Sequence, residues 1–393
     1  MEVKQIAEDR KQMMSQIILI GRPSNSLAKQ LVGELHGAIL VDPKDLSDTY
    51  AGASYVYLSH SADRDGMTPD LLEAARVFQF ASENGGGKFV LISSALIYGT
   101  GPNRPPFVDE SYRAPGNTSG SIRECWDSLE SSATTQLGST SKLTILRLSL
   151  VEGSSAFPAR LFARRLVPTL PGHDPVLQLL SLKDLAQAVR CVISQQKPGT
   201  FNLAPDTVVP LHKAVRLAHS TRIPVPRTLS RLLRRAETLE YLRYSWTISN
   251  HKIKSELGFI PNQSSAAAFK QKRNGSHLAN ELTFDEFGMD KDYIKFYGKT
   301  LFKFMSEFYW RIEDKGLEYI PASGRGVLVG MHRGFMPFDG VMAMHTIVKK
   351  TGRYPRFLTH PGLLKFPFLA VALPKSSPKP CEFIGKVFFN SSI

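Results

Sequence analysis

Cysteine is scarce in this chain of 393 residues, which contains only Cys125, Cys191 and Cys381. These three residues lie far apart and form no CxxC pair. The pattern argues against a disulfide framework, and we predict no structural zinc or other metal site. Such sparse cysteine is typical of a reducing compartment, so we expect a cytoplasmic protein.

Long apolar runs are also missing. A membrane-spanning helix needs roughly 18 apolar residues, and the apolar run "FPFLAVALP" at 366–374 is too short. The first 14 residues carry charges of both signs without an apolar core, unlike a secretory signal. We therefore predict no spanning helix and treat residues 1–14 as an N-terminal tail.

The composition is that of a folded protein, with 42% hydrophobic and 21% charged residues. The length allows two or three domains. Lysine and arginine number 49 against 35 acidic residues, which gives a net charge of +14. This surplus favours acidic partners such as nucleic acid, anionic lipid or phosphorylated substrates. Because no long block of basic residues occurs, we expect no nucleic-acid partner.

The first hundred residues alternate between apolar runs and helix-compatible segments. Strands are predicted at 16–21, 38–42, 53–59 and 88–99, and helices at 25–37 and 68–86. In the second helix, Thr68 is the expected N-cap and Pro69 lies in the first turn. This order predicts an α/β fold with a Rossmann-like, doubly wound parallel sheet.

Folds of this type bind pyrophosphate at the first strand–helix turn. Here the turn is "GRPSNSL" (21–27), and it begins with Gly21. Ser24 and Leu27 occupy positions where glycine would let a phosphate approach the backbone. Asp42 follows Gly21 by 21 positions, where a ribose-binding acid is expected. The turn is thus either a degenerate nucleotide site or a strand–helix connection without a ligand.

Several later motifs occur in a familiar order: "FVLISSALIYG", "LTILRLSLVEG", "LLSLKDLAQAVRCVI", "GTFNLA" and "HKIKSELGFIP". Over residues 15–262 the chain resembles the extended short-chain dehydrogenases/reductases, the NAD-dependent epimerase/dehydratase-like proteins. The resemblance implies an NAD(P) cofactor, with Gly21, Asp42 and Ser94 as cofactor-binding positions. It also implies a downstream tyrosine that exchanges the proton and a lysine that lowers its pKa.

The helix that should carry this pair reads "GNTSGSIRECWDSLE" (116–130) and contains neither tyrosine nor lysine. Ser119 or Gly120 stands near the tyrosine position, and Arg123 or Glu124 near the lysine position. Without a phenol of adjustable pKa, no acid or base for hydride chemistry is evident. We therefore predict a degenerate domain that serves as a scaffold or a nucleotide sensor.

Small, polar and basic residues at 263–280 predict a linker, and residues 281–393 form the second predicted domain. Residues 284–312 are rich in aromatics and lysine. Phe304, Phe308 and Ile312 share one helical stripe. Such a stripe is typical of a core, but aromatic side chains beside lysine also describe a helix in a membrane interface.

The phrase "GMHRGFMPFDG" (330–340) follows the apolar strand-like run "GVLV". Pro337 fits the first turn of a helix that starts near Phe338, so His332 and Asp339 could face each other. An aspartate that binds one imidazole nitrogen leaves the other free to act as a base. The helix N-terminus nearby would favour a phosphate or an oxyanion.

"GLEYIPASGRGVLVGMHRGFMPFDG" resembles the glycerophospholipid acyltransferases of the lysophosphatidic acid type, over about 284–375. The resemblance implies His332 as the general base and Asp339 as its partner. It also implies acyl-CoA or acyl-carrier protein as donor and a lysophospholipid-like acceptor. Met331 replaces the usual asparagine, six residues rather than four separate His332 from Asp339, and the downstream Gly-Thr-Arg-type block is absent. We therefore expect an apparently truncated α/β acyltransferase-like domain.

Two functions remain open from the sequence. The first is a membrane-surface acyltransferase, peripheral on the inner face of an anionic membrane, with a degenerate dinucleotide-fold domain in front. The second is an NAD(P)-dependent epimerase/dehydratase or oxidoreductase with a C-terminal membrane-anchoring piece.

Overall fold

The computed structural model describes residues 16–50, 52–59, 61, 66–84, 88–114, 121–138, 142–225, 236–270, 291–330, 338–357 and 386–389. The chain forms two compact units. The first comprises Met1–Gly101, Phe107–Leu170 and Pro175–Ser276, and the second contains His277–Ile393. Each unit is described by itself below.

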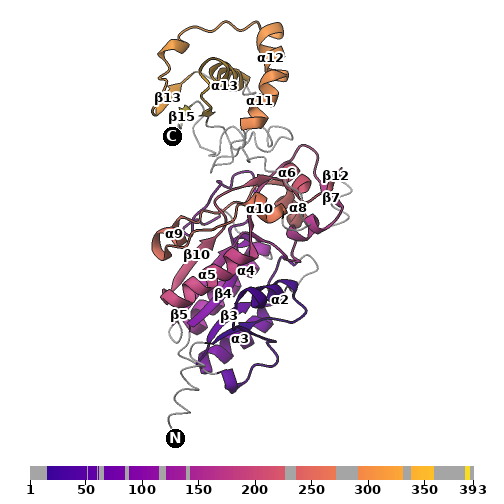
Figure 1. The fold of residues 1–393 in the computed structure, drawn as a ribbon, viewed down its shortest axis with the longest axis vertical. Coiled ribbons are helices and arrows are strands. Elements are labelled where there is room, and N and C mark those ends of the chain that lie inside the picture. Colours follow the sequence, from indigo (N-terminus) through magenta and orange to yellow (C-terminus); the bar gives the residue numbers. More distant parts are fainter. Residues whose placement is uncertain are drawn as a thin grey trace. The chain divides into compact units, whose positions relative to one another are not determined.

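A six-stranded parallel sheet forms the centre of the first unit (Figure 1), with strand order β10-β5-β4-β3-β1-β2. Its strands are β1 (Ile17–Ile20), β2 (Ile39–Val41), β3 (Ser54–Leu58), β4 (Lys88–Ser94), β5 (Lys142–Leu148) and β10 (Gly199–Leu203). The register pairs Ile18 of β1 with Ile39 of β2 on one side and with Tyr55 of β3 on the other. The predicted Rossmann-like parallel sheet is thereby confirmed.

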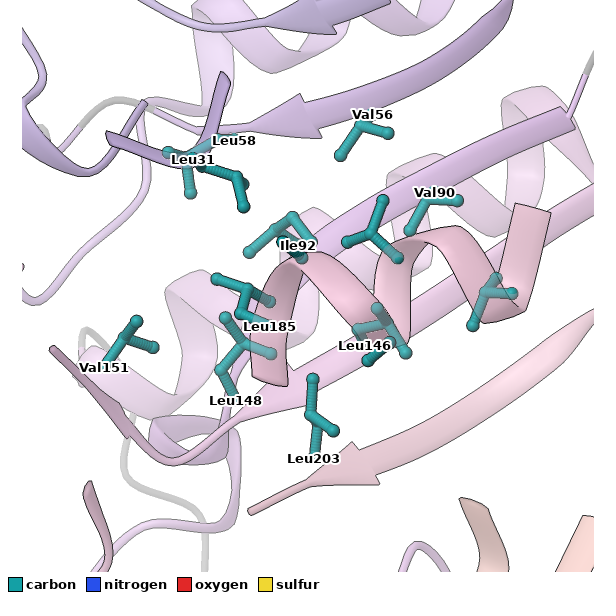
Figure 2. Packing of buried hydrophobic residues seen from close by; sticks show 14 of the residues in the cluster. Leu31, Val56, Leu58, Val90, Ile92, Leu146, Leu148, Val151, Leu185 and Leu203 are labelled. Atoms are coloured by element: carbon teal, nitrogen blue, oxygen red, sulfur yellow. The ribbon is translucent and has the colours of Figure 1, made fainter. Parts of the chain in front are cut away.

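Helices cover both faces of this sheet, as α/β folds require to bury two apolar surfaces. On one face, α2 (Ser26–Glu34), α5 (Leu182–Gln195) and α9 (His251–Leu257) pack on residues from β1, β3, β4, β5 and β10. Figure 2 shows part of this cluster, in which Leu185 of α5 lies over Leu146 and Leu148 of β5. On the other face, α3 (Leu71–Glu83) and α4 (Ile122–Leu137) complete a second cluster.

Side-chain caps fix where these helices begin, because the first backbone N–H groups of a helix need acceptors. Asn25, Asp70, Ser121 and Ser181 accept hydrogen bonds at the starts of α2, α3, α4 and α5. The predicted cap of the 68–86 helix was therefore wrong. Asp70, not Thr68, accepts from the N–H of Glu73 at 3.1 Å, and a carboxylate suits the positive end of a helix.

The rest of the first unit consists of short elements. They are η1 (Asp48–Tyr50), η2 (Ala95–Tyr98), β6 (Leu150–Val151), η3 (Ala159–Ala163), β7 (Leu166–Thr169), β8 (Val176–Leu177), β9 (Leu179–Leu180), β11 (Val209–Pro210), α6 (Leu211–Leu217), β12 (Thr221–Pro224), α8 (Ala236–Arg243) and α10 (Ser265–Lys270). The strands among them form small two-stranded sheets: β6 pairs with β9, β8 with β11 and β7 with β12.

The predicted linker differs from the structure at its start. Residues 265–270, within the expected linker 263–280, form helix α10. The Ser265 hydroxyl donates to the Thr207 carbonyl at 2.5 Å, and the Phe269 ring meets Phe162 edge-on at 4.8 Å between centroids. The buried side chains of this helix belong to the core of the first unit, which therefore extends at least to Lys270.

The second unit contains α11 (Lys291–Lys299), α12 (Leu301–Lys303), the π-helical turn η4 (Phe304–Tyr309), η5 (Leu317–Tyr319), β13 (Gly326–Val329), α13 (Phe338–Thr351), β14 (Pro355–Phe357) and β15 (Lys386–Phe389). Its strands form an antiparallel sheet in the order β13-β15-β14. The predicted strand at "GVLV" and the predicted helix start near Phe338 are both present.

Candidate functional site

A cavity of about 110 Å³ lies at the carboxyl ends of the parallel strands of the first unit. Its walls include Ser59 after β3, Ser94 at the end of β4 and Ser149 after β5, together with Asn25 before α2. Within the sheet, β2 lies next to β1 on one side and β3 lies next to β1 on the other, so the direction in which the chain adds strands reverses at β1. Such a topological switch point is where open α/β sheets bind ligands.

The polar side chains that line this cavity are all uncharged. Its polar side chains are Asn25, Ser59, Ser61, Thr68, Ser93, Ser94, Trp126, Ser149, Ser154, Ser155 and Trp246. Among the described residues, its walls contain no aspartate, glutamate, histidine, cysteine, tyrosine, lysine or arginine. The side chains here can therefore donate and accept hydrogen bonds but offer neither a charge nor a group that titrates near neutral pH.

Ser94 is the one predicted cofactor-binding residue that the structure brings to the cavity. It ends β4 and caps η2, because its hydroxyl oxygen accepts a hydrogen bond from the N–H of Leu96 at 3.2 Å. This cap holds the Ser94 side chain at the carboxyl end of β4. The resemblance had placed Ser94 at the end of this strand, where β4 does end, although the apolar pattern had extended the strand to residue 99.

Gly21 and Asp42 lie outside the lining of the cavity. Gly21 is buried, and a Cβ at this position would lie 3.4 Å from the Cβ of Ala28 and 3.5 Å from the carbonyl oxygen of Leu58. These are ordinary van der Waals distances, so the packing around this position does not by itself require a glycine. Asp42 is half-buried, and its carboxylate accepts from the N–H of Lys44 at 3.1 Å in a local turn.

Part of the hydrogen-bonding capacity of the turn between β1 and α2 is used within the protein itself. The Asn25 side chain accepts from the N–H of Leu27 at 2.9 Å, so one donor of the helix start is occupied. The Leu27 side chain, only 7% exposed, forms part of the cavity wall. Arg22 forms ion pairs with Glu73 at 2.5 Å and Asp70 at 3.2 Å. The cation of this turn is thus paired with two carboxylates of the protein itself.

Trp126 is the residue of α4 that lines the cavity, and its indole N–H donates to the carbonyl of Met67 at 2.7 Å. Arg123 and Glu124, which the sequence placed near the lysine position, do not line it. Ser119 and Gly120 lie outside the described residues. On the described part of this helix, neither a phenol nor an amine faces the cavity.

These observations test whether an NAD(P) cofactor fits. Ligand pockets for cofactors enclose roughly 300–1,000 Å³, whereas this cavity has about 110 Å³. The Leu27 side chain stands where a glycine would admit the pyrophosphate, and Arg22 is bound to carboxylates. The described residues therefore do not fit a dinucleotide placed for hydride transfer in the manner of the family.

A buried polar network beside the cavity was missed by the sequence analysis. Arg147 of β5 and Glu130 of α4 form an ion pair at 2.6 Å, and each side chain is about nine-tenths buried. Ser93 donates to Glu130 at 2.5 Å. Arg147 also donates to the Tyr98 hydroxyl at 2.8 Å, which in turn donates to the Asn202 side chain at 2.7 Å. An arginine within the apolar run "LTILRLSL" was the available signal.

The electrostatics of this network keep Arg147 charged and Tyr98 neutral. Burial lowers the pKa of Arg147, but the hydrogen bonds and charge of Glu130 outweigh this and raise the pKa above its ordinary value. Burial raises the pKa of Tyr98, although the nearby Arg147 charge partly opposes this. Tyr98 therefore stays protonated near neutral pH and acts as a hydrogen-bond donor rather than a base.

The predicted catalytic pair of the second unit is described only in part. His332 lies outside the described residues. Asp339 is exposed in the first turn of α13, where its carboxylate accepts from the N–H of Gly340 at 2.8 Å. The structure therefore places the aspartate at the start of a helix, as expected, and leaves the His332–Asp339 pairing a prediction.

Within the described ranges, no group of three or more His, Cys, Asp or Glu side chains is placed to hold a metal ion. None of the helices in the described part of the chain combines the length and the apolar character needed to cross a bilayer.

Solved structures share the fold of the first unit at low sequence identity. MoeE5 bound to UDP-glucuronic acid and NAD superposes with a TM-score of 0.52 and 14% identity, covering 65% of this chain and 96% of that one. A dTDP-4-dehydrorhamnose reductase from Bacillus anthracis, in complex with NADP, gives 0.51 and 15% over 65% and 98%. A UDP-N-acetylglucosamine 4-epimerase from Bacillus cereus gives 0.50 and 13% over 66% and 98%. The first unit thus has the Rossmann-like fold of the epimerase, dehydratase and reductase class.

The curated relatives are proteins of undetermined function. The uncharacterized protein Rv0501 of Mycobacterium tuberculosis is 30% identical over 207 residues, which is 49% of this chain and 55% of that protein. A second protein of the same organism, Rv0502, is 35% identical over 65 residues, or 16% of this chain and 18% of its own length. The chain spans about half the length, or less, of the curated relatives it matches. No protein-family model matches.

Proposed function

We propose that the first unit is a non-catalytic domain of the epimerase/reductase fold that acts as a scaffold or a ligand sensor and does not transfer hydride. The observation that carries this proposal is the absence of any ionisable side chain from the described walls of the cavity. The ligand, or the part of it that enters the cavity, is small and uncharged. The reason is that no side chain of the described walls supplies a counter-charge.

Hydride transfer to or from a carbinol carbon requires that a proton move as well, and a positioned group must accept or donate it. The cavity offers Ser94 and other hydroxyls, whose protons are held too tightly for this work unless a neighbouring base activates them. The carboxylate of Glu130 accepts a hydrogen bond from the lining Ser93 at 2.5 Å, but it is held in its ion pair with Arg147. Tyr98, the nearby phenol, is committed to Arg147 and Asn202.

Trp246 supports ligand binding at this cavity. It lines the wall, is 6% exposed, and its indole nitrogen is buried without a hydrogen-bond partner. A buried donor without an acceptor costs about 1–3 kcal/mol. An oxygen acceptor on a bound ligand would remove that cost, and the surrounding serine hydroxyls would supply further hydrogen bonds.

The alternative is an NAD(P)-dependent epimerase, dehydratase or reductase. It is supported by the fold shared with structures whose titles name NAD or NADP, and by the position of Ser94 at the cavity. The two proposals differ in one measurable respect. The alternative requires a bound dinucleotide that exchanges hydride with a substrate, and the non-catalytic domain does not.

Fluorescence titration of the full chain with NADH and NADPH distinguishes the two. We expect weak binding or none, and no change in absorbance at the nicotinamide band when UDP- and dTDP-sugars are added. The Ser94→Ala variant should behave as the wild type does. Tight binding together with turnover that Ser94→Ala removes would overturn the proposal and establish the alternative.

A second candidate function concerns the second unit, namely acyl transfer from acyl-CoA or acyl-carrier protein to a lysophospholipid-like hydroxyl. The observation in its favour is local: β13 (326–329) precedes α13 (338–351), whose first turn holds Asp339. This order of a strand followed by a helix is the one that the His332–Asp339 hypothesis requires. In this hypothesis His332 takes the proton of the attacking hydroxyl, and Asp339 orients the imidazole.

The acyl-transfer candidate is tested by moving a labelled acyl group from a thioester to lysophospholipid with the full natural protein. His332→Ala and Asp339→Asn should each lower the rate by about 10²–10⁴-fold, the range for general acid–base groups. His251→Ala, on an exposed position of α9, is the matched control and should leave the rate unchanged. Equal rates in wild type and His332→Ala would contradict this candidate.

A further inference from the structure

Four lysines follow one another at intervals of four along the start of the second unit. Lys291, Lys295 and Lys299 lie on α11 and Lys303 on α12, and all four are exposed. In a helix, residues four apart lie on the same face. We call these four residues the lysine row. Lys291, Lys295 and Lys299 thus lie along one side of α11, and Lys303 follows on α12 after a break in the helix at Thr300.

Large apolar side chains are exposed on both sides of Lys303, the last lysine of the row. Leu301 is 47% exposed, Phe304 57%, Phe308 66% and Tyr309 68%. The rings of Phe304 and Phe308 stack at 6.2 Å between centroids with an interplanar angle of 20°. We call these four residues the apolar patch. Single exposed apolar residues are ordinary, but a contiguous cluster marks an interaction surface.

Glu307, the acidic residue of η4, is paired with lysines of the same unit. Glu307 lies 2.8 Å from the ammonium of Lys349 and 4.0 Å from that of Lys303. The hydrogen bond from Lys349 and the nearby positive charges lower the pKa of Glu307, so the carboxylate is charged and paired. An anionic partner that approaches the apolar patch would therefore meet a surplus of positive charge.

From this combination we propose that the lysine row and the apolar patch dock the second unit on an anionic lipid bilayer. Lysine stems lie along apolar surface while their ammonium groups reach toward headgroups, and aromatic rings favour the interfacial zone. A protein partner would require pockets complementary to each ring, whereas a bilayer accepts exposed rings of any arrangement. The row of like charges matches the continuous negative surface of a membrane. This proposal does not depend on the function proposed for either unit.

Vesicle flotation of the full chain tests the proposal. The vesicles contain either phosphatidylcholine alone or phosphatidylcholine with about one-third phosphatidylserine, at low and at high salt. The wild type should float with the anionic vesicles at low salt, and high salt should weaken the interaction because it screens surface charge. Circular dichroism and thermal unfolding confirm that each variant is folded.

Two sets of variants separate the contributions. Lys295→Gln/Lys299→Gln should weaken binding by about fivefold for each lysine, since each surface-proximal lysine contributes about that factor. Phe304→Ser/Phe308→Ser should weaken binding at least tenfold at every salt concentration, because it removes the inserting rings. The matched controls, Lys29→Gln and Leu72→Ser, are exposed residues of the first unit and should bind as the wild type does.

Three results would overturn the proposal. They are failure of the wild type to float with either vesicle, equal binding to neutral and anionic vesicles, and unchanged binding in both pairs of variants. If the wild type does not float but forms a dimer that Phe304→Ser/Phe308→Ser dissolves, the patch contacts a second copy of the chain instead of lipid.

Discussion

The two units bury their apolar residues to very different degrees, and the difference separates two kinds of surface. In the first unit, both faces of the sheet are covered by clusters of fully buried side chains. In the described part of the second unit, the buried apolar side chains are Ile294, Met342, Met344 and Ile347, whereas the apolar patch is exposed. The first unit is thus stabilised by apolar burial within itself. The exposed apolar patch of the second unit points instead to a binding partner.

Breaking the buried ion pair of the first unit should have the largest effect. Arg147→Met leaves the Glu130 carboxylate buried without its cation, and such a loss costs about 3–5 kcal/mol. Urea unfolding followed by circular dichroism measures it. The control is Lys254→Gln, which removes an exposed pair with Asp206 and should cost about 1 kcal/mol or less. Equal costs for the two variants would show that the buried pair has no special role.

The comparison of cores is sharpened by one large-to-small substitution in each unit. Leu146→Ala removes a side chain that is 0% exposed in the centre of the sheet and should cost about 2–5 kcal/mol. Met344→Ala, on α13 of the second unit, should cost less than half as much, because fewer buried neighbours hold the space open. Thermal unfolding of both variants checks this, and a larger cost for Met344→Ala would reverse the comparison.

His345 should give the smallest effect, as a dependence of stability on pH. Burial and the charge of Lys349 lower its pKa, although Glu307 partly opposes this. The folded state therefore binds its proton less readily than the unfolded state, whose pKa is about 6.5. The contribution of neutral His345 is complete above that pH and is lost as the pH falls below it. Thermal unfolding at pH 7.5 and 5.5 should show a smaller acid loss in His345→Gln than in the wild type. The same loss in both would exclude His345 as the source.

The alternation of apolar and helical segments was enough to predict the parallel sheet, because strands buried on both faces must be continuously apolar. The start of α3 was misplaced, since Thr68 and Asp70 are both good caps and only the fold shows which one reaches the N–H of Glu73. Helix α10 was mistaken for linker. Its serine and alanines resemble a flexible segment, yet Ala266 and Ala268 are buried where the helix packs closely.

The candidate site was predictable only in part. The strand that carries Ser94 was predictable because it is strongly apolar, and Ser94 lies at the cavity, whereas its role in cofactor binding stays a prediction. The network around Arg147 was not predicted, because its members are far apart in sequence and meet only in the fold; the bonded pair Tyr98 and Asn202, for example, is 104 positions apart. Trp126 escaped notice for a similar reason. The alignment by resemblance pointed to Arg123, whereas the orientation of α4 brings Trp126 to the cavity.

The central claim is that the first unit does not transfer hydride, and isotope transfer tests it most directly. The full chain is incubated with NADH or NADPH deuterated at the reactive nicotinamide carbon and with keto forms of UDP- and dTDP-sugars. The reverse reaction uses NAD and deuterated sugars, and mass spectrometry follows the label in both directions. We predict no movement of deuterium beyond the protein-free control. Protein-dependent transfer that Ser94→Ala abolishes would contradict the claim and show that the domain is an active oxidoreductase.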